Sequence, residues 1–347
     1  MASSVLAPAY TVTLGNQRWT TQALDVTIVL DAAPGLDRAV VTFPAAAPVS
    51  AAPNDSATFE LAAGTGDDPV PVLTGTVRAV TRADRTITVE CADAGAVLAA
   101  YRPGTSFEQT SAASVVRALC DDVGVDVGPV DTGPSLTAYV ADPTRSAFDH
   151  IARLASWSGA LASVDGDGRL TTRVVDGVQP DLALRHDREL LRISQRKVAA
   201  PVAEFVVAGE AGASSASPPD AARPTSDFFA GDRPDGPGPT VRWSFEPALR
   251  TPEAAAVAGA ALRRTATSRR HRTTLDAWLV PALRPGMVVR LDELPDGLAA
   301  GPHWVERVVH RVGPGGATTS AHLAEAGAAF DPLALLGSLA GALGSLL

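Results

Sequence analysis

The first hundred residues alternate between apolar and polar side chains, which indicates antiparallel β-strands with one buried face. The alternation is clearest over residues 25–30 and 86–91, where every second side chain is apolar. A short polar segment at residues 82–85 precedes the second of these and is typical of a hairpin connection. Further strand candidates cover residues 11–14, 38–43, 58–61 and 70–80. These segments predict a small barrel or sandwich over residues 8–98.

The middle of the chain changes to the spacing of three or four residues that is typical of amphipathic helices. Residues 111–123 and 145–158 both place apolar side chains on one helical face at this spacing. Thr144 is a candidate N-cap for the second helix. Gly159 follows that helix, at the position where a left-handed residue commonly ends a helix.

An Asp-Gly-Asp-Gly segment at residues 165–168 joins two short strand candidates, residues 161–164 and 170–175. A calcium loop is one interpretation, but the EF-hand pattern needs further ligands and a late glutamate that are absent here. A tight hairpin turn is the simpler interpretation. Together with the two helices, this hairpin predicts a compact α+β module over residues 99–189.

Strand patterns return after about residue 190. Candidates cover residues 202–208, 241–245, 273–280, 287–291, 304–309 and 318–324. Thr251 is a candidate cap for a helix that continues to about residue 267, because Pro252 suits the first helical position. Residues 209–240 are rich in Ala, Ser, Pro, Gly and Asp, which predicts a long surface loop. We therefore predict a second β unit over residues 190–328.

The apolar C-terminal tail, residues 329–347, has a pattern of its own. Its leucines are spaced three, four and three residues apart, which is the spacing of a coiled-coil seam. The four positions are Leu336, Leu339, Leu343 and Leu346. Three glycines weaken this segment as an isolated helix, so we predict that it needs a partner surface. A strapped-down or disordered end is the alternative.

Charge and cysteine content exclude several classes of protein. The 347 residues carry a formal net charge of −9, which argues against a protein that mainly binds nucleic acid. Cys91 and Cys120 match no metal-binding spacing, and their apolar neighbours predict two buried thiols. Residues 1–10 lack the features of a secretory signal, and no run is long enough to span a membrane. We expect cytoplasmic synthesis without cofactor, metal or membrane span.

The densest basic cluster follows the predicted helix near residue 267. Its arginines are Arg263, Arg264, Arg269, Arg270 and Arg272. One interpretation is an interface patch that faces an acidic surface, cargo or DNA. The other is a solvated helix end, where arginines complement the negative end of the helix dipole.

Candidate catalytic chemistry is sparse. The sequence lacks the Gly-x-Ser-x-Gly, His-Glu-x-x-His and Gly-x-x-x-x-Gly-Lys motifs. His303 and His310 are seven residues apart in a predicted strand, which would place them on opposite faces and away from a shared metal. Most of the tryptophans are expected in cores: Trp19, Trp157, Trp243, Trp278 and Trp304. We predict that the protein is not an enzyme.

Several short motifs occur in an order that resembles one protein family. Val-Leu-Thr-Gly-Thr-Val at residues 72–77 resembles its early hairpin, and residues 107–119 resemble its first helix. Residues 146–170 resemble its combination of helix, glycine and Asp-Gly hairpin. Pro-Gly-Met-Val-Val at residues 285–289 and the segment 303–310 resemble its closing strands.

That family is the baseplate hub, or phage late-control, family of contractile phage tails, which is similar to hubs of extracellular contractile injection systems and to the hub half of type VI secretion spike proteins. The resemblance implies a mainly β fold with an α+β insertion, in which two tail-tube-like antiparallel β-barrels flank the module. It also implies a homotrimer whose six barrels form a ring. The ring would adapt the hexameric inner tube to a trimeric spike, with other baseplate proteins as partners.

Residues 329–347 are all that follow the second predicted barrel, so we expect the spike to be a separate polypeptide within the assembled particle. Two alternatives remain. A receptor- or effector-binding tail module would show an exposed aromatic or polar patch and would not need to form trimers. A tail-associated cell-wall hydrolase would need a catalytic constellation in a pocket, and it would act on purified peptidoglycan.

Overall fold

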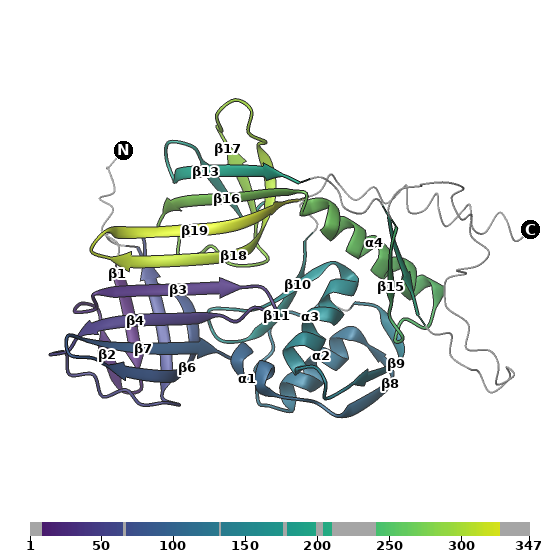
Figure 1. Cartoon of the computed structure of the whole chain (residues 1–347), viewed down its shortest axis with the longest axis horizontal. Helices are drawn as coiled ribbons and strands as arrows, with labels where there is room; N and C mark the ends of the chain where they lie inside the picture. Colours follow the sequence, from purple (N-terminus) through teal and green to yellow (C-terminus); the bar gives the residue numbers. More distant parts are fainter. Residues whose placement is uncertain are drawn as a thin grey trace, which may run out of the picture.

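One continuous β-sheet of 13 strands runs through both halves of the chain. The computed structural model describes residues 9–64, 67–131, 133–175, 179–198, 204–209 and 241–326. In Figure 1 the strands lie one above another from β13 to β6, and a module that contains the helices lies beside them. The mainly β class that the alternation predicts is confirmed.

The first half of the chain contributes seven strands to this sheet. They are β1 (Ala9–Leu14), β2 (Gln17–Trp19), β3 (Asp25–Asp31), β4 (Arg38–Pro44), β5 (Ser56–Ala62), β6 (Val70–Arg82) and β7 (Thr86–Asp93). All pair antiparallel, in the order β3-β4-β7-β6-β5-β1-β2. Strand β4 shows how apolar–polar alternation corresponds to burial, because every second residue (Ala39, Val41 and Phe43) is fully buried on one face.

The second half contributes six strands. They are β12 (Leu182–Arg185), β13 (Leu190–Lys197), β16 (His271–Trp278), β17 (Val288–Asp292), β18 (Gly301–Gly313) and β19 (Gly316–Glu325). Their order is β13-β16-β19-β18-β17-β12, which repeats the order β3-β4-β7-β6-β5-β1 strand for strand. The two halves are therefore a structural duplication, although β12 pairs parallel with β17 whereas β1 pairs antiparallel with β5.

The halves join through β3 and β18. These strands pair antiparallel from Arg307 opposite Asp31 to Val312 opposite Val26, and one hydrophobic core holds side chains of both halves. The predicted pair of tail-tube-like β-barrels is not confirmed in its detail, because the described strands form an open path and no closed barrel. The physical reason is that the outer edge of β3 pairs with a strand of the other half and not with one of its own.

A smaller α+β module packs beside the sheet. Its elements are α1 (Gly95–Ala100), β8 (Thr105–Ser111), α2 (Ala112–Asp121), β9 (Ser135–Ala141), α3 (Ala147–Ser158), β10 (Ala160–Val164) and β11 (Leu170–Val174), and β14 (Glu204–Ala208), β15 (Val241–Phe245) and α4 (Pro252–Ser268) adjoin it. Its core is built on Phe148, Ile151 and Trp157 of α3, and α4 adds Ala255 and Ala258. The division of the chain at residues 98, 189 and 328 stays a prediction.

Local signals fix the ends of the main helix of the module. Ser146 accepts a hydrogen bond from the Asp149 N–H, and Asp149 accepts one from the Ser146 N–H, which is a capping box. Gly159 ends the helix in the left-handed conformation with φ 73°. The prediction of Thr144 as the cap is wrong, because its hydroxyl bonds Asp142 instead.

The predicted tryptophan positions are confirmed in part. Trp19, Trp157 and Trp304 are buried in cores, whereas Trp278 is 42% exposed at the end of β16. The side chain of Trp243 lies outside the described residues. Both cysteines are buried free thiols, as predicted.

Candidate functional site

The basic cluster near residue 267 is distributed over three elements. Arg263 and Arg264 are exposed on the last turns of α4. Arg269 donates to the Glu306 carboxylate over 2.8 Å and lies over the Trp304 ring, 5.8 Å from its centroid. Arg269 therefore takes part in holding α4 to β18, and an interface role for the cluster stays a prediction.

The remaining arginines of the cluster lead onto the sheet. Arg270 precedes β16, and Arg272 is exposed on β16 directly opposite Arg196 of β13. Two exposed arginines on adjacent strands repel each other, and an acidic partner at this corner of the sheet stays a prediction. The tail leucines Leu336, Leu339, Leu343 and Leu346 lie outside the described residues.

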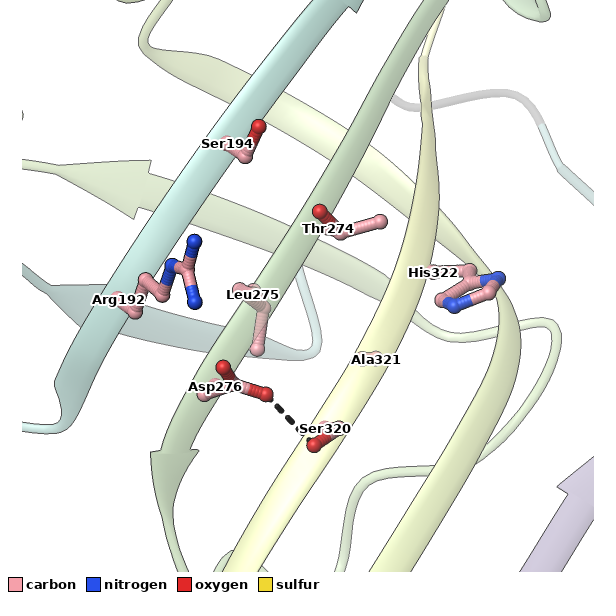
Figure 2. A pocket seen from close by; sticks show the side chains of 8 residues that line it. All are labelled: Arg192, Ser194, Thr274, Leu275, Asp276, Ser320, Ala321 and His322. Carbon is pink, nitrogen blue, oxygen red and sulfur yellow. Dashed lines mark hydrogen bonds between the residues drawn. The ribbon is translucent and has the colours of Figure 1, made fainter.

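The side of the sheet that faces away from the core carries polar side chains in register, which we call the polar face. Arg192 of β13 lies opposite Asp276 of β16, which lies opposite Ser320 of β19. The neighbouring row is Ser194, Thr274 and His322. These rows line a pocket of about 320 Å³, and Figure 2 shows their side chains standing on three adjacent strands.

The polar face has no arrangement for nucleophilic catalysis among the residues that line this pocket. Ser320 Oγ donates directly to Asp276 Oδ1 over 2.6 Å, and His322 points away from that pair (Figure 2). A catalytic triad requires the histidine between the serine and the carboxylate. The pocket instead presents hydrogen-bond donors and acceptors at the surface.

The polar face continues across the junction between the halves. His322 lies opposite Arg307 of β18, and Arg307 approaches the Asp31 carboxylate of β3 at 3.6 Å. Both partners are partly exposed, so the pair adds little stability but carries the charged surface onto the first half. The result is one extended polar surface and not an isolated pocket.

Beneath this surface, one arginine links three parts of the chain. Arg284, from the segment between β16 and β17, donates to the carbonyl oxygens of Pro71 and Val72 on β6, the latter over 3.1 Å. On the same strand, Thr74 Oγ1 donates to the Gly166 carbonyl over 2.7 Å. The predicted Asp-Gly-Asp-Gly turn is thus confirmed as a hairpin turn, and it docks on β6.

Two buried carboxylates lie near this link. Asp37 Oδ1 accepts from the Asp31 N–H over 2.6 Å, and Asp93 Oδ1 accepts from the Gly95 N–H over 3.1 Å. Burial raises the pKa of Asp93 to about 7. Burial, and then the Asp93 charge, raise the pKa of Asp37 well above its usual range. Burial also lowers the pKa of Arg284.

Sequence reasoning missed this group, because Asp37, Asp93 and Arg284 are far apart in the chain and follow no motif. Their burial and their proximity come from the tertiary fold alone. Within the described ranges, no cluster of three or more His, Cys, Asp or Glu side chains could hold a metal ion. No described helix is long and apolar enough to cross a membrane.

Comparison with known proteins gives a clear result for the fold. No family model and no curated protein matches the chain, but solved structures do. The 43 kDa tail protein of prophage MuSo2 from Shewanella oneidensis aligns with a TM-score of 0.67 at 14% identity, over 92% of this chain and 99% of that chain. The chain has the fold of phage tail proteins.

Two further structures support the same conclusion. The tail protein from Neisseria meningitidis MC58 gives a TM-score of 0.68 at 13% identity, over 92% of this chain and 96% of that chain. The c3393 protein of E. coli, a type VI secretion component with similarity to the T4 tail proteins gp27 and gp5, gives 0.60 at 9% identity, over 90% and 76%. The phage-tail fold therefore extends over nearly the whole chain.

Proposed function

We propose that the protein is a structural baseplate hub of a contractile tail or injection system, in which a homotrimer adapts a hexameric inner tube to a trimeric spike. The fold shared with phage tail proteins and with a type VI secretion component supports a place in such a tail. The residues that line the pocket described above show no catalytic arrangement, and the role that we propose is mechanical.

The observation that carries this proposal is the duplicated strand order. Each chain holds two halves of the same order, joined through β3 and β18. Three such chains present six similar halves around an axis while they keep threefold symmetry. A duplicated chain in a trimer can therefore match a sixfold partner on one side and a threefold partner on the other.

The mass of the purified full chain in solution tests this proposal. Light scattering should give three times the 35.5 kDa of one chain, either alone or after addition of candidate spike and tube proteins from the same genome. Trimer formation on addition of the spike would fit an assembly in which folding and association are linked. A stable monomer in the presence of both partners would contradict the hub proposal.

The C-terminal tail gives a second test. We propose that the seam leucines meet near the trimer axis and contact the spike, so replacing all four by serine should weaken spike binding by at least about tenfold. The four changes are Leu336→Ser, Leu339→Ser, Leu343→Ser and Leu346→Ser. Replacing Leu333, Leu335 and Leu347, which lie off the seam, is the matched control. Equal binding by both variants would remove the seam from the proposal.

A further inference from the structure

Strands β6 and β18 occupy the same place in the two halves. Each has 13 residues, and its pairing with the strand that follows it in sequence is irregular at one point: between Val77 and Ala79 where β6 pairs with β7, and between Val305 and Arg307 where β18 pairs with β19. The backbone N–H and C=O of the residue before each irregularity both bond the loop that precedes the adjacent strand, β5 in the first half and β17 in the second. Those bonds are Asn54 N to Val77 O at 2.8 Å, Val77 N to Asp55 O at 2.9 Å, Gly286 N to Val305 O at 2.9 Å and Val305 N to Met287 O at 2.9 Å. The equivalence therefore extends to individual hydrogen bonds.

Beyond the irregularity the two strands differ. In β18 this part pairs with β3 on one side and β19 on the other, and His310 within it is fully buried. In β6 the equivalent part, residues 79–82, pairs with β7, and among the described strands nothing pairs with its other side. Arg82, which matches His310 in position, is exposed. The β6 edge is therefore a free edge where β18 has a partner.

The counterpart of β3 is also free. Strand β13 takes the position of β3 in the second half, and the described strands pair with it only through β16. Its flanking side chains Leu191 and Val198 are 44% and 36% exposed. In Figure 1, β13 and β6 lie at opposite ends of the stack of strands. One chain thus has both members of a second junction, but six strands lie between them in the sheet order and they do not pair within the chain.

We propose that β13 of one copy pairs antiparallel with β6 of the next copy and repeats the β3–β18 junction between chains. This inference rests on the trimer proposed above and assigns its interface. The contact is heterologous, so each added copy again leaves a free β13 and a free β6 until a ring closes. Three copies would close it with six junctions, half within chains and half between them.

The existing pairs fix the register of this contact. In the second half, Ser194 pairs with Thr274, Thr274 with His322, and His322 with Arg307, across four adjacent strands. In the first half, Thr27 pairs with Val40, Val40 with Glu90, and Glu90 with Ala79, across the equivalent strands. Ala79 is therefore the equivalent of Arg307, and Val198 is the equivalent of Asp31, four residues after Ser194 and Thr27 respectively. Because Arg307 lies opposite Asp31, Ala79 should lie opposite Val198. The same register places Lys197 opposite Val80, Arg196 opposite Thr81 and Gln195 opposite Arg82.

The side chains on these edges disfavour pairing with unrelated strands. Lys197 stands where the internal junction has the buried Leu30, and exposed arginines flank it on both edges. Charged residues on an edge strand oppose indiscriminate strand pairing. The main-chain hydrogen bonds of an added strand would supply the attraction. The intermolecular junction is therefore expected to be weaker than the internal one.

Cysteine crosslinking tests the register directly. Full-length Arg196→Cys and Thr81→Cys chains with different tags are mixed and oxidised; both positions are exposed, and directly opposed residues lie within reach of a disulfide. Cys91 and Cys120 are buried and should stay silent. A mixed-tag dimer that a reductant dissolves is expected. Arg272→Cys mixed with Thr81→Cys is the control, because Arg272 is exposed but lies one strand farther from the edge.

The crosslinking result and the mass in solution together distinguish the proposed junction from the proposed trimer. A crosslink from position 196 that exceeds the control at least about tenfold supports the proposed junction. A trimeric mass without that crosslink, or equal crosslinking from position 272, overturns the register and leaves the hub proposal standing. A monomer that forms no crosslink even with spike and tube proteins overturns both.

Discussion

Replacing Arg284 with methionine is expected to lower the free energy of unfolding by about 2 kcal/mol, because it removes a charged donor from two backbone carbonyls in a partly buried site. The carbonyl groups of Pro71 and Val72 would lose this partner. The buried Asp37 would also lose the attraction of the guanidinium charge, which lowers the pKa of Asp37. Denaturant unfolding of the full chain, followed by its midpoint and slope, measures the loss.

The same change should loosen a specific region. Arg284 belongs to the second half, its acceptors to the first half, and the turn at Gly166 to the module. A Cβ added at Gly166 would overlap the Pro71 carbonyl and the Arg284 guanidinium, so the three parts are in close contact. Hydrogen exchange is therefore expected to rise around residues 70–74 and 165–168, and not in α2.

Arg290→Met is the matched control for Arg284→Met. Arg290 lies in the same half and bonds Asp292 at 2.9 Å, but its side chain is 52% exposed. Exposed ion pairs contribute about 0–1 kcal/mol, so this variant should stay close to the wild type. Equal losses in both variants would contradict the assignment of Arg284 as the link between the three parts.

Elements with strong local signals could be predicted from the sequence. The apolar stripe of α3 and its closing Gly159 gave a helix that ends where the structure ends it. The alternation in β4 and β7 gave strands correct to within about two residues. In these segments the apolar positions in the sequence are the positions that the tertiary structure buries, so the pattern predicts both the element and its buried face.

Segments whose burial does not follow a simple period could not be predicted. Strand β8 is largely exposed and polar, so no strand was predicted there, whereas the helix predicted from residue 111 does begin directly after Ser111, which caps it. His303 and His310 were expected on opposite faces. The extra residue Glu306 in β18 reverses the alternation between them, and both are buried on the core side. A bulge is set by the partner strand and leaves no periodic signal.

The duplication was also hidden from the sequence, because equivalent positions hold different chemistry. Leu30 and Lys197 are equivalent, as are His310 and Arg82, yet one member of each pair is buried and the other exposed. Their equivalence is a property of strand order and register alone. The candidate sites were missed for the same reason, since the acidic pair and Arg284 come together only after three distant segments pack.

Asp93→Asn is expected to stabilise the protein at pH 8 and to leave its stability nearly unchanged near pH 4. Burial raises the pKa of Asp93 to about 7 from its ordinary value of 3.8, so the folded state binds more protons than the unfolded state between those values. Stability that the protonated carboxyl contributes at acidic pH is therefore lost as pH rises from about 4 to about 7. The amide stays neutral and keeps an oxygen for the Gly95 N–H.

The gain at pH 8 should be on the order of 4 kcal/mol, because the pKa of Asp93 rises by about three units and each unit corresponds to about 1.4 kcal/mol. Unfolding of both proteins at pH 4, 6 and 8 measures the difference as it develops. Asp84→Asn is the control, because the Asp84 side chain is 87% exposed and its removal should leave the pH dependence unchanged. A gain for Asp93→Asn that is equal at all three pH values would mean that its carboxyl titrates alike in both states. The argument that burial raises the pKa of Asp93 would then fail.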